Sequence, residues 1–327
     1  MCASPCPTTS PPNPPPETHP PERRPALQLG LAVWSFPGWI GEFYPKGSTS
    51  KHFLDLYGQR LTTVEGNTTF YSVPSPETIA RWVERTPDGF EFCLKLHRDI
   101  THAGLLVPQI DLAQRFYQTI SGLGDRLGVS FLQLPPRYGP ASLGDLERFL
   151  TAWPRDRAPI AVEVRHPAWF QHPRAMALNT RLAELQVGRV LLDTRPIYST
   201  DDDPQRHSRR KKPQLPLQPI AIGGYAFVRF ISHPRLEINQ PFLEEWVGHV
   251  QAWLAAGIRV YFFVHCPIEE HSPRVAQRFH TLLTEAGVKI PPLNGSSLGS
   301  SLNPPINSPI DPSVHTPLNT TTQLRLF

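Results

Sequence analysis

Six charged side chains of this sequence stand near the ends of short apolar segments. They are Glu65, Lys95, Glu163, Arg165, Asp193 and Arg229. Carboxylates beside a histidine, here His265, allow acid–base catalysis, and the three cations could hold an anion. The pattern therefore predicts a site for a small polar or anionic ligand, provided that the fold brings these segments together.

The segments themselves are typical of β-strands. The predicted strands are Leu29–Phe36, Leu61–Asn67, Glu91–His97, Val129–Pro135, Ile160–His166, Arg189–Arg195, Tyr225–His233 and Arg259–Cys266. Helical patterns separate most of them, and strands that alternate with helices indicate a parallel sheet. Eight such units between residues 27 and 290 predict an α/β fold of the (β/α)8 TIM-barrel type.

Alternation along each strand indicates which side chains face the barrel axis. Helices cover the outer face, so that face must be apolar and the polar side of each strand must point inward. The predicted inward residues are Thr63, Glu65, Asn67, Cys93, Lys95, Phe131, Gln133, Ala161, Glu163, Leu191, Asp193, Phe227, Arg229, Phe263 and His265. The polar residue comes late in each strand, so we expect a filled lower interior and a charged C-terminal mouth, where barrel enzymes place their active sites.

A simpler interpretation is a polar layer in which Glu65 or Glu163 pairs with Lys95 or Arg229. Lys95 could likewise be an amine nucleophile or only a member of an ion pair. Buried charges contribute little to stability, so a ring of polar, mostly charged residues on seven strands favours a site.

A divalent metal site is a further alternative, since Glu, Asp and His on successive strands can converge on one ion. Three cations, Lys95, Arg165 and Arg229, would repel that ion, so we predict no metal ligands and assign no cofactor. Phosphate could instead bind backbone N–H groups in the loop after the seventh strand or at the helix start Ser272-Pro273.

The connection between the sixth and seventh strands, residues 197–224, lacks a helical period. Three aspartates precede five Lys or Arg within Arg206–Lys212. We predict that a charged loop replaces the helix here, either as a solvated insertion or as a lid or anion-binding arm.

Composition indicates one domain between two tails. Residues 1–26 and 291–327 are rich in Pro, Ser, Asn and Thr, and are predicted to be disordered. The net charge of +4 permits an anionic partner without requiring one. We expect a cytoplasmic protein with no membrane contact, because the sequence has no apolar signal segment and no apolar run long enough to span a bilayer.

Several stretches resemble the YecE-like family, a domain of unknown function. They include "VWSFPGWIGEFYP", "VEGNTTFYSVPSPETIARWVERTPDGFEFCLKLHRDITH", "FLQLPP", "AVEVRHPAWF", "VRFISHP" and "YFFVHCPIEEHSP". The resemblance runs from about Leu29 to Leu283 and implies a TIM barrel. Its motif positions also include Thr101. Two places differ from a common form of the family, at Ile231-Ser232-His233 and at His265-Cys266-Pro267.

We therefore assign candidate roles as follows. The candidate catalytic residues are Glu65, Lys95, Glu163, Asp193 and His265. The candidate substrate-binding residues are Trp34, Asn67, Phe70, Tyr71, His102, Gln133, Arg165, His166, Trp169 and Arg229.

Three functions compete, and the family resemblance brings no established reaction to choose among them. The first is an enzyme acting on a small phosphate- or sugar-like substrate. The second is a nucleic-acid-binding or nucleic-acid-processing protein, suggested by the basic run Arg206–Lys212 and by aromatic residues that could stack on bases. The third is a non-catalytic adaptor.

Overall fold

A computed structural model describes residues 26–201, 208–209, 212–290 and 293 of the chain. The predicted disordered tails lie outside the described residues, except for Ala26 and Leu293. Ile290 and Leu293 pack against the hydrophobic core. The packed domain therefore reaches Leu293, beyond the predicted boundary at residue 290.

Eight parallel strands form the sheet, in the order β3-β2-β1-β8-β7-β6-β5-β4. They are β1 (Leu27–Leu31), β2 (Thr63–Gly66), β3 (Glu91–Leu94), β4 (Ser130–Gln133), β5 (Ile160–Glu163), β6 (Gly188–Asp193), β7 (Tyr225–Ile231) and β8 (Arg259–His265). Isolated bridges join β3 to β4 through Phe92–Leu127 and Lys95–Phe131. The sheet thus curves back on itself, and the predicted TIM barrel is confirmed.

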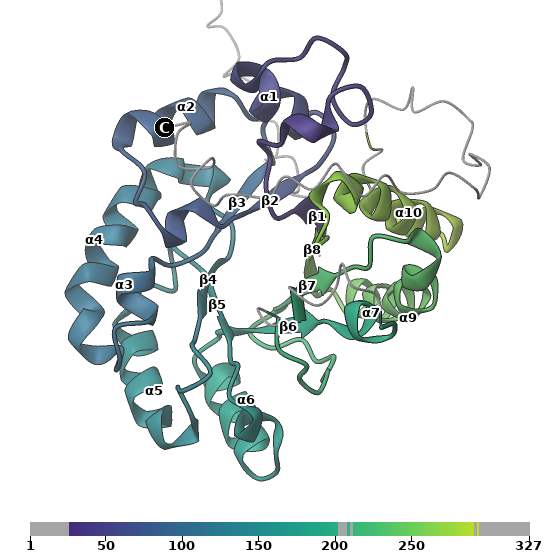
Figure 1. Cartoon of the computed structure of the whole chain (residues 1–327). Coiled ribbons are helices and arrows are strands. Elements are labelled where there is room, and N and C mark those ends of the chain that lie inside the picture. The colour runs from purple at the N-terminus through teal and green to yellow at the C-terminus, as the bar shows by residue number, and fades with distance from the viewer. Residues whose placement is uncertain (1–25, 202–207, 210–211, 291–292, 294–327) are drawn as a thin grey trace, which may run out of the picture.

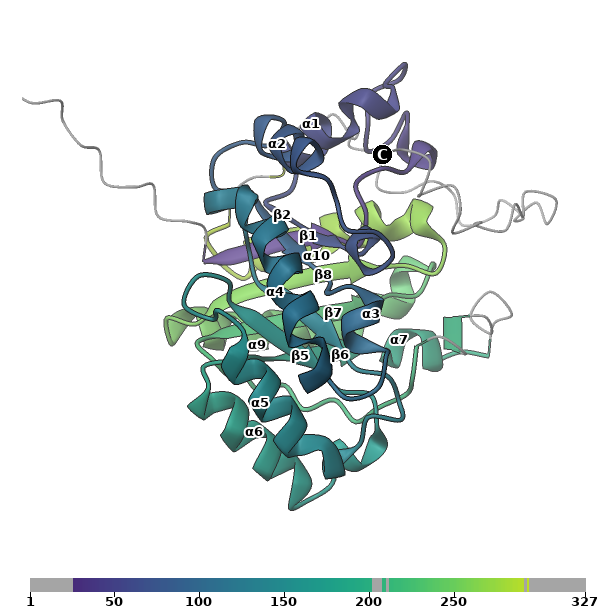
Figure 2. The ribbon, with the colours of Figure 1, turned by 90° about the vertical axis from the view of Figure 1, so that its left-hand side faces the viewer.

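Helices surround the strands (Figure 1). They are α1 (Phe53–Gly58), α2 (Pro76–Glu84), α3 (Arg98–Thr101), α4 (Ile110–Ile120), α5 (Leu143–Ala152), α6 (Arg174–Glu184), α7 (Arg195–Tyr198), α9 (Leu236–Ala255) and α10 (Ser272–Glu285). Figure 2 shows the short helices α3 and α7 at the same end of the sheet, where they follow β3 and β6. This end is the mouth of the barrel.

Local signals explain where several helices begin and end. Ser75 caps α2 by accepting a hydrogen bond from Thr78 N, and Pro76 fixes the first turn. After α9, Gly257 takes a positive φ of 74°, which suits a residue that follows a helix C-terminus. α10 begins at Ser272, with Pro273 in its first turn, and His271 occupies the capping position.

Each strand ends earlier than the sequence predicted. β1, for example, ends at Leu31 instead of Phe36, and β7 ends at Ile231 instead of His233. The polar residues that follow the last sheet pairing lie on turns, as Asn67 does before the 3-10 turn Thr68–Phe70. The mouth is therefore built from both strand ends and the turns above them.

Between β6 and β7, the described residues contain the four-residue helix α7. Arg206, Arg210 and Lys211 of the basic run lie outside the described residues. Arg209 stacks on Tyr198, with its guanidinium carbon 5.4 Å from the ring centroid, and donates a hydrogen bond to Ile197 O. Tyr198 in turn donates to Lys212 O. This part of the basic run is folded onto its own loop.

Two apolar layers lie on either side of the strands. The outer layer fills the space between strands and helices and includes Val64, Val162 and Val228. The inner layer fills the middle of the barrel with Cys93, Val129, Phe131, Ala161, Val190, Tyr225, Phe227, Tyr261 and Phe263. This inner layer separates the polar groups at the mouth from those at the lower end.

Candidate functional site

Arg229 of β7 is the centre of the polar groups at the mouth. Its Nε and Nη2 donate hydrogen bonds of 2.8 and 2.7 Å to the two carboxylate oxygens of Glu65 on β2. Its Nη1 donates to Glu163 Oε2 on β5. All three side chains are buried, so one guanidinium bridges two carboxylates across the barrel.

Five further residues extend this arrangement. Glu163 Oε1 accepts from Arg165 Nε at 2.6 Å and from Gln133 Nε2 at 2.7 Å. Gln133 Oε1 accepts from Lys95 Nζ at 2.9 Å. On the other side, Glu65 lies 2.9 Å from His265 Nε2 and accepts from Asn67 Nδ2 at 2.7 Å.

We call these eight residues the mouth network: Glu65, Asn67, Lys95, Gln133, Glu163, Arg165, Arg229 and His265.

The two carboxylates of the mouth network are held in their charged form. Burial alone would raise the pKa of Glu65, but Arg229 and His265 outweigh it and keep that pKa well below its usual range. Burial acts in the same way on the pKa of Glu163, and Arg229, Arg165 and Lys95 lower it. Neither carboxyl group is suited to donate a proton near neutral pH.

Lys95 has the opposite property. Burial, followed by the charge of Arg229, lowers the pKa of its amine from 10.5 to about 7. The amine lies 3.8 Å from the centroid of the Phe70 ring. A lysine with a pKa near neutrality can both release and accept a proton.

His265 is the ionisable member of the mouth network whose neutral form is favoured at pH 7. Burial lowers the pKa of its imidazole to about 4, although Glu65 opposes the shift. Its ring is therefore better suited to exchange a hydrogen bond with Glu65 than to add positive charge.

Four other candidate residues form or flank the rim. The edge of Phe70 meets Tyr71 and His102, with ring centroids 5.0 and 5.1 Å apart. Tyr71 is 46% exposed. Burial and the nearby charge of Lys95 lower the pKa of His102 to about 4. His166 accepts a hydrogen bond from Ala168 N and caps the turn after β5.

Asp193 does not face the barrel axis, so its predicted inward orientation is wrong. Its carboxylate accepts a hydrogen bond from Trp246 Nε1 of α9 at 2.8 Å and pairs with Arg195 at 2.9 Å. Val190 belongs to the inner layer and Leu191 to the outer layer, the reverse of the predicted assignment. Asp193 thus joins β6 to a covering helix.

Two tryptophans also lie away from the mouth network. Trp169 is fully buried in the outer layer, and its Nε1 donates to Tyr138 O. Trp34 packs edge-on against Trp82 and Phe92, outside the barrel axis. The prediction that both rings contact a ligand at the mouth is not met by this arrangement.

Several N–H groups of the predicted backbone phosphate cradle make internal hydrogen bonds. After β7, Ser232 N donates to His265 O at 2.8 Å, and His233 N donates to Asn239 Oδ1 at 2.7 Å. The N–H of His271, just before α10, donates to Ile268 O. These three N–H groups therefore do not face a ligand, whereas the side-chain cations of the mouth network lie at the same end of the barrel.

Two residues missed by the sequence interpretation face the same space. Burial, followed by the charge of Arg229, lowers the pKa of the Lys212 amine to about 7. Burial raises the pKa of Glu269 to about 8, and its Oε1 has no hydrogen-bond partner within the described chain. Glu269 stands in the quoted motif after β8, which was the one signal for it. Lys212 was visible only as part of a basic run.

The lower end of the barrel holds a second polar group. Glu91, the first residue of β3, pairs with Arg259 Nη1 at 3.1 Å and accepts from Tyr261 OH at 2.8 Å. Tyr261 also accepts from Arg259 Nη1. This set contains one carboxylate, that of Glu91, and one guanidinium group, that of Arg259.

The described residues contain neither a cluster of metal ligands nor a membrane-spanning helix. Within residues 26–201, 208–209, 212–290 and 293, no three His, Cys, Asp or Glu side chains come together as metal ligands. In the same residues, no helix combines the length and apolar character that crossing a bilayer requires.

Comparison with known proteins identifies relatives of similar length. A family model described as "Protein of unknown function DUF72" matches residues 28–297. The UPF0759 protein YecE of Escherichia coli K12 is 33% identical over 268 residues, which cover 81% of this chain and 94% of that protein. The UPF0759 protein YunF of Bacillus subtilis 168 is 23% identical over 255 residues, covering 68% of this chain and 83% of YunF.

Solved structures with the same fold include two DUF72 family proteins. One, from Enterococcus faecalis, superposes with a TM-score of 0.63 at 18% identity, covering 83% of this chain and 99% of that one. The other, from Thermotoga maritima, has a TM-score of 0.62 at 21% identity, covering 79% of this chain and 99% of that one.

Proposed function

This chain belongs to the DUF72 family, and we propose that it is an enzyme acting on a small anionic, phosphate- or sugar-like substrate at the barrel mouth. Lys95 is the proposed proton-transfer group. The proposal rests above all on the excess of positive charge in the mouth network.

The charge excess follows from the ion pairs. Glu65 and Glu163 are the two carboxylates of the mouth network, whereas Arg165, Arg229 and Lys95 are its cations. Lys212 adds a second amine, the fourth cation, from the loop above. The two carboxylates balance the two guanidinium groups, so the protonated fraction of each amine is excess positive charge, which an anionic substrate group would balance.

Lys95 combines position with an adjusted pKa. Arg229 is fully occupied by the two carboxylates, but among the described residues the Lys95 amine has one hydrogen-bond partner, Gln133, and one aromatic face, Phe70. With a pKa of about 7, a fraction of the amine is neutral at physiological pH and can take a proton from the substrate. Glu65 and Glu163 then serve to position Arg229 and Arg165.

Nucleic-acid binding remains the alternative function, but the described part of the basic run gives it no added support. Arg209 stacks on Tyr198 and Lys212 faces the mouth network, so neither forms an outward cationic surface.

The experiment is a screen of sugar phosphates and inorganic phosphate by calorimetry, followed by turnover assays with the compounds that bind. Lys95→Met should weaken binding at least 10-fold because it removes a cation. Lys95→Arg should retain binding but lose turnover by about 10²–10⁴-fold, since a guanidinium does not release its proton at neutral pH.

Arg181→Ala on α6 is the control, because Arg181 is exposed and pairs only with Glu147 and Glu184 among the described residues. It should leave binding and turnover unchanged. Equal turnover by the wild type and Lys95→Arg would contradict the proposed role of Lys95. The absence of any anion binding by the wild type would contradict the substrate class.

A further inference from the structure

We propose a second ligand site, independent of the mouth, that binds a small phosphorylated molecule with a planar ring, a nucleotide in chemical class. The site is a cleft between the segment after β1, the end of β2, and α2. The Trp34 cleft is the name used below for this cavity, which is lined by Ala32, Val33, Trp34, Ser35, Ser50, Lys51, Leu54, Asn67, Thr68, Arg81, Trp82 and Arg85.

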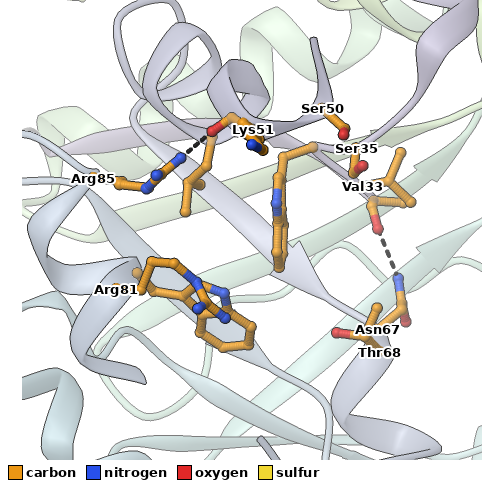
Figure 3. A pocket seen from close by; sticks show the side chains of 12 residues that line it. Val33, Ser35, Ser50, Lys51, Asn67, Thr68, Arg81 and Arg85 are labelled. Carbon is orange, nitrogen blue, oxygen red and sulfur yellow. Dashed lines mark hydrogen bonds between the residues drawn. The ribbon is translucent and has the colours of Figure 1, made fainter. Parts of the chain in front are cut away.

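The size of the Trp34 cleft suits such a ligand. Its volume is about 550 Å³, and pockets for small molecules typically measure about 300–1,000 Å³. Figure 3 shows Arg81 and Arg85 on one side of the cavity and Asn67 and Thr68 on the opposite side. A ligand lying between these sides would contact both.

The charge of the Trp34 cleft is positive. Lys51, Arg81 and Arg85 line it, and none of its lining residues is acidic. Arg85 lies 3.6 Å from Asp55, but Lys51 and Arg81 have no carboxylate partner within the described chain. Arginine guanidinium groups bind phosphate through paired hydrogen bonds, which favours a phosphate over a single weak anion.

An aromatic wall accompanies these cations. Trp82 stacks on Phe92 with centroids 5.3 Å apart, and Trp34 stands nearly perpendicular to both rings. Trp34 is only partly buried, whereas its two neighbours are buried. A fixed indole at the edge of a cavity can stack on a planar ring, as aromatic side chains do on nucleic-acid bases.

One buried polar atom also lacks a partner here. Thr68 belongs to the wall of the Trp34 cleft, and its Oγ1 is buried and makes no hydrogen bond to any described residue. A buried hydroxyl without a partner is unfavourable, so a ligand oxygen that meets it after rotation of the side chain would gain a hydrogen bond.

Asn67 separates the Trp34 cleft from the mouth. Its Nδ2 donates to Glu65 Oε1 in the mouth network and to Ala32 O beside the cleft. The amide is therefore part of the wall, and none of the other seven mouth-network residues lines the cleft. The second site does not depend on the function proposed for the mouth.

The experiment titrates the full chain with AMP, ATP, adenosine and inorganic phosphate, using calorimetry. AMP and ATP should bind. Adenosine and inorganic phosphate should each bind at least 10-fold more weakly, because adenosine lacks the phosphate for the cations and inorganic phosphate lacks the ring that stacks on Trp34. The double variant Lys51→Ala/Arg81→Ala should weaken AMP binding at least 10-fold, and Trp34→Leu about 10-fold.

Lys46→Ala/Arg115→Ala is the matched control, because it removes the same charge from exposed positions outside the cleft. Its affinity for AMP should equal that of the wild type. Far-UV circular dichroism and the melting temperature establish that each variant is folded.

Three results would overturn the proposal: no AMP or ATP binding at millimolar concentration, unchanged affinity in the folded double variant, or tighter binding of a short single-stranded oligonucleotide than of ATP. The last result would assign the cleft to nucleic acid. Mouth variants such as Lys95→Met should not change AMP affinity, which keeps this test separate from the test of the mouth.

Discussion

The two ends of the barrel interior both contain buried ion pairs, yet they differ in charge balance. At the lower end, Glu91 meets one cation, Arg259, and one hydroxyl, Tyr261. At the mouth, two carboxylates pair with two guanidinium groups, the Lys95 amine donates to Gln133 beside them, and a fourth cation, Lys212, approaches from the loop above. A buried ion pair is thus no sign of function by itself. The unbalanced charge is what distinguishes the mouth.

The largest expected difference concerns the two arginines. Arg229→Met leaves two carboxylates buried without their main partner and should lower the free energy of unfolding by about 3–5 kcal/mol. Arg259→Met should cost about 1–2 kcal/mol, because its side chain is 25% exposed and Glu91 keeps the Tyr261 hydrogen bond. Urea unfolding of both variants measures the difference. Equal losses would mean that the two ends are energetically alike.

The next effect is a pH dependence that belongs to the mouth alone. The pKa values of Lys95 and Lys212 are about 7 in the folded protein and 10.5 ordinarily. Between about pH 7 and 9 the unfolded chain therefore binds more protons, so the free energy of unfolding rises with pH. Each lysine adds up to about 1.4 kcal/mol per pH unit.

The raised pKa of Glu269, about 8, opposes this rise below pH 8. Above about pH 8, Lys95→Met should remove about half of the rise, as measured by urea unfolding at several pH values. Glu91→Gln is the control at the lower end and should leave the slope unchanged, because the inner apolar layer separates it from Lys95 and Lys212. A slope that is the same in Lys95→Met and in the wild type would contradict the lowered pKa of Lys95.

The smallest expected effect is at the lower end. Tyr261→Phe removes one hydrogen bond to Glu91 and should lower the free energy of unfolding by about 1 kcal/mol. Binding of anions at the mouth should not change, because the inner apolar layer separates the two ends. Weaker anion binding in this variant would show that the ends are coupled.

Sequence alternation located most of the mouth, for a physical reason. In β3, β5 and β7 one side carries only apolar residues, such as Val162 and Val228, so the orientation of the strand follows directly. β6 has Val190, Leu191 and Leu192 in succession. Because these residues are apolar on both sides of the strand, they do not indicate which side faces the barrel axis. The orientation of Asp193 is set by Trp246, 53 residues away, which no local pattern reveals.

Other features depend on three-dimensional burial. The sequence around Trp169 and around Trp34 is equally compatible with a ring buried in the core and with a ring at the rim of the mouth. Only the packing of the folded chain distinguishes the two positions. The raised pKa of Glu269 arises mainly from burial of a loop residue. Local sequence predicts strands well because their period is local, but it does not predict which loop covers a carboxyl group.

The junction of β3 and β4 has a consequence for how the barrel fluctuates. These strands meet only through isolated bridges, whereas β7 and β8 pair along seven residues. Local opening of the barrel therefore requires the least free energy at this junction. The Lys95–Gln133 hydrogen bond spans it. A ligand that binds both side chains would stabilise the closed junction. Ligand binding should therefore reduce local opening of the barrel, and the free energy of opening should rise with ligand affinity and concentration.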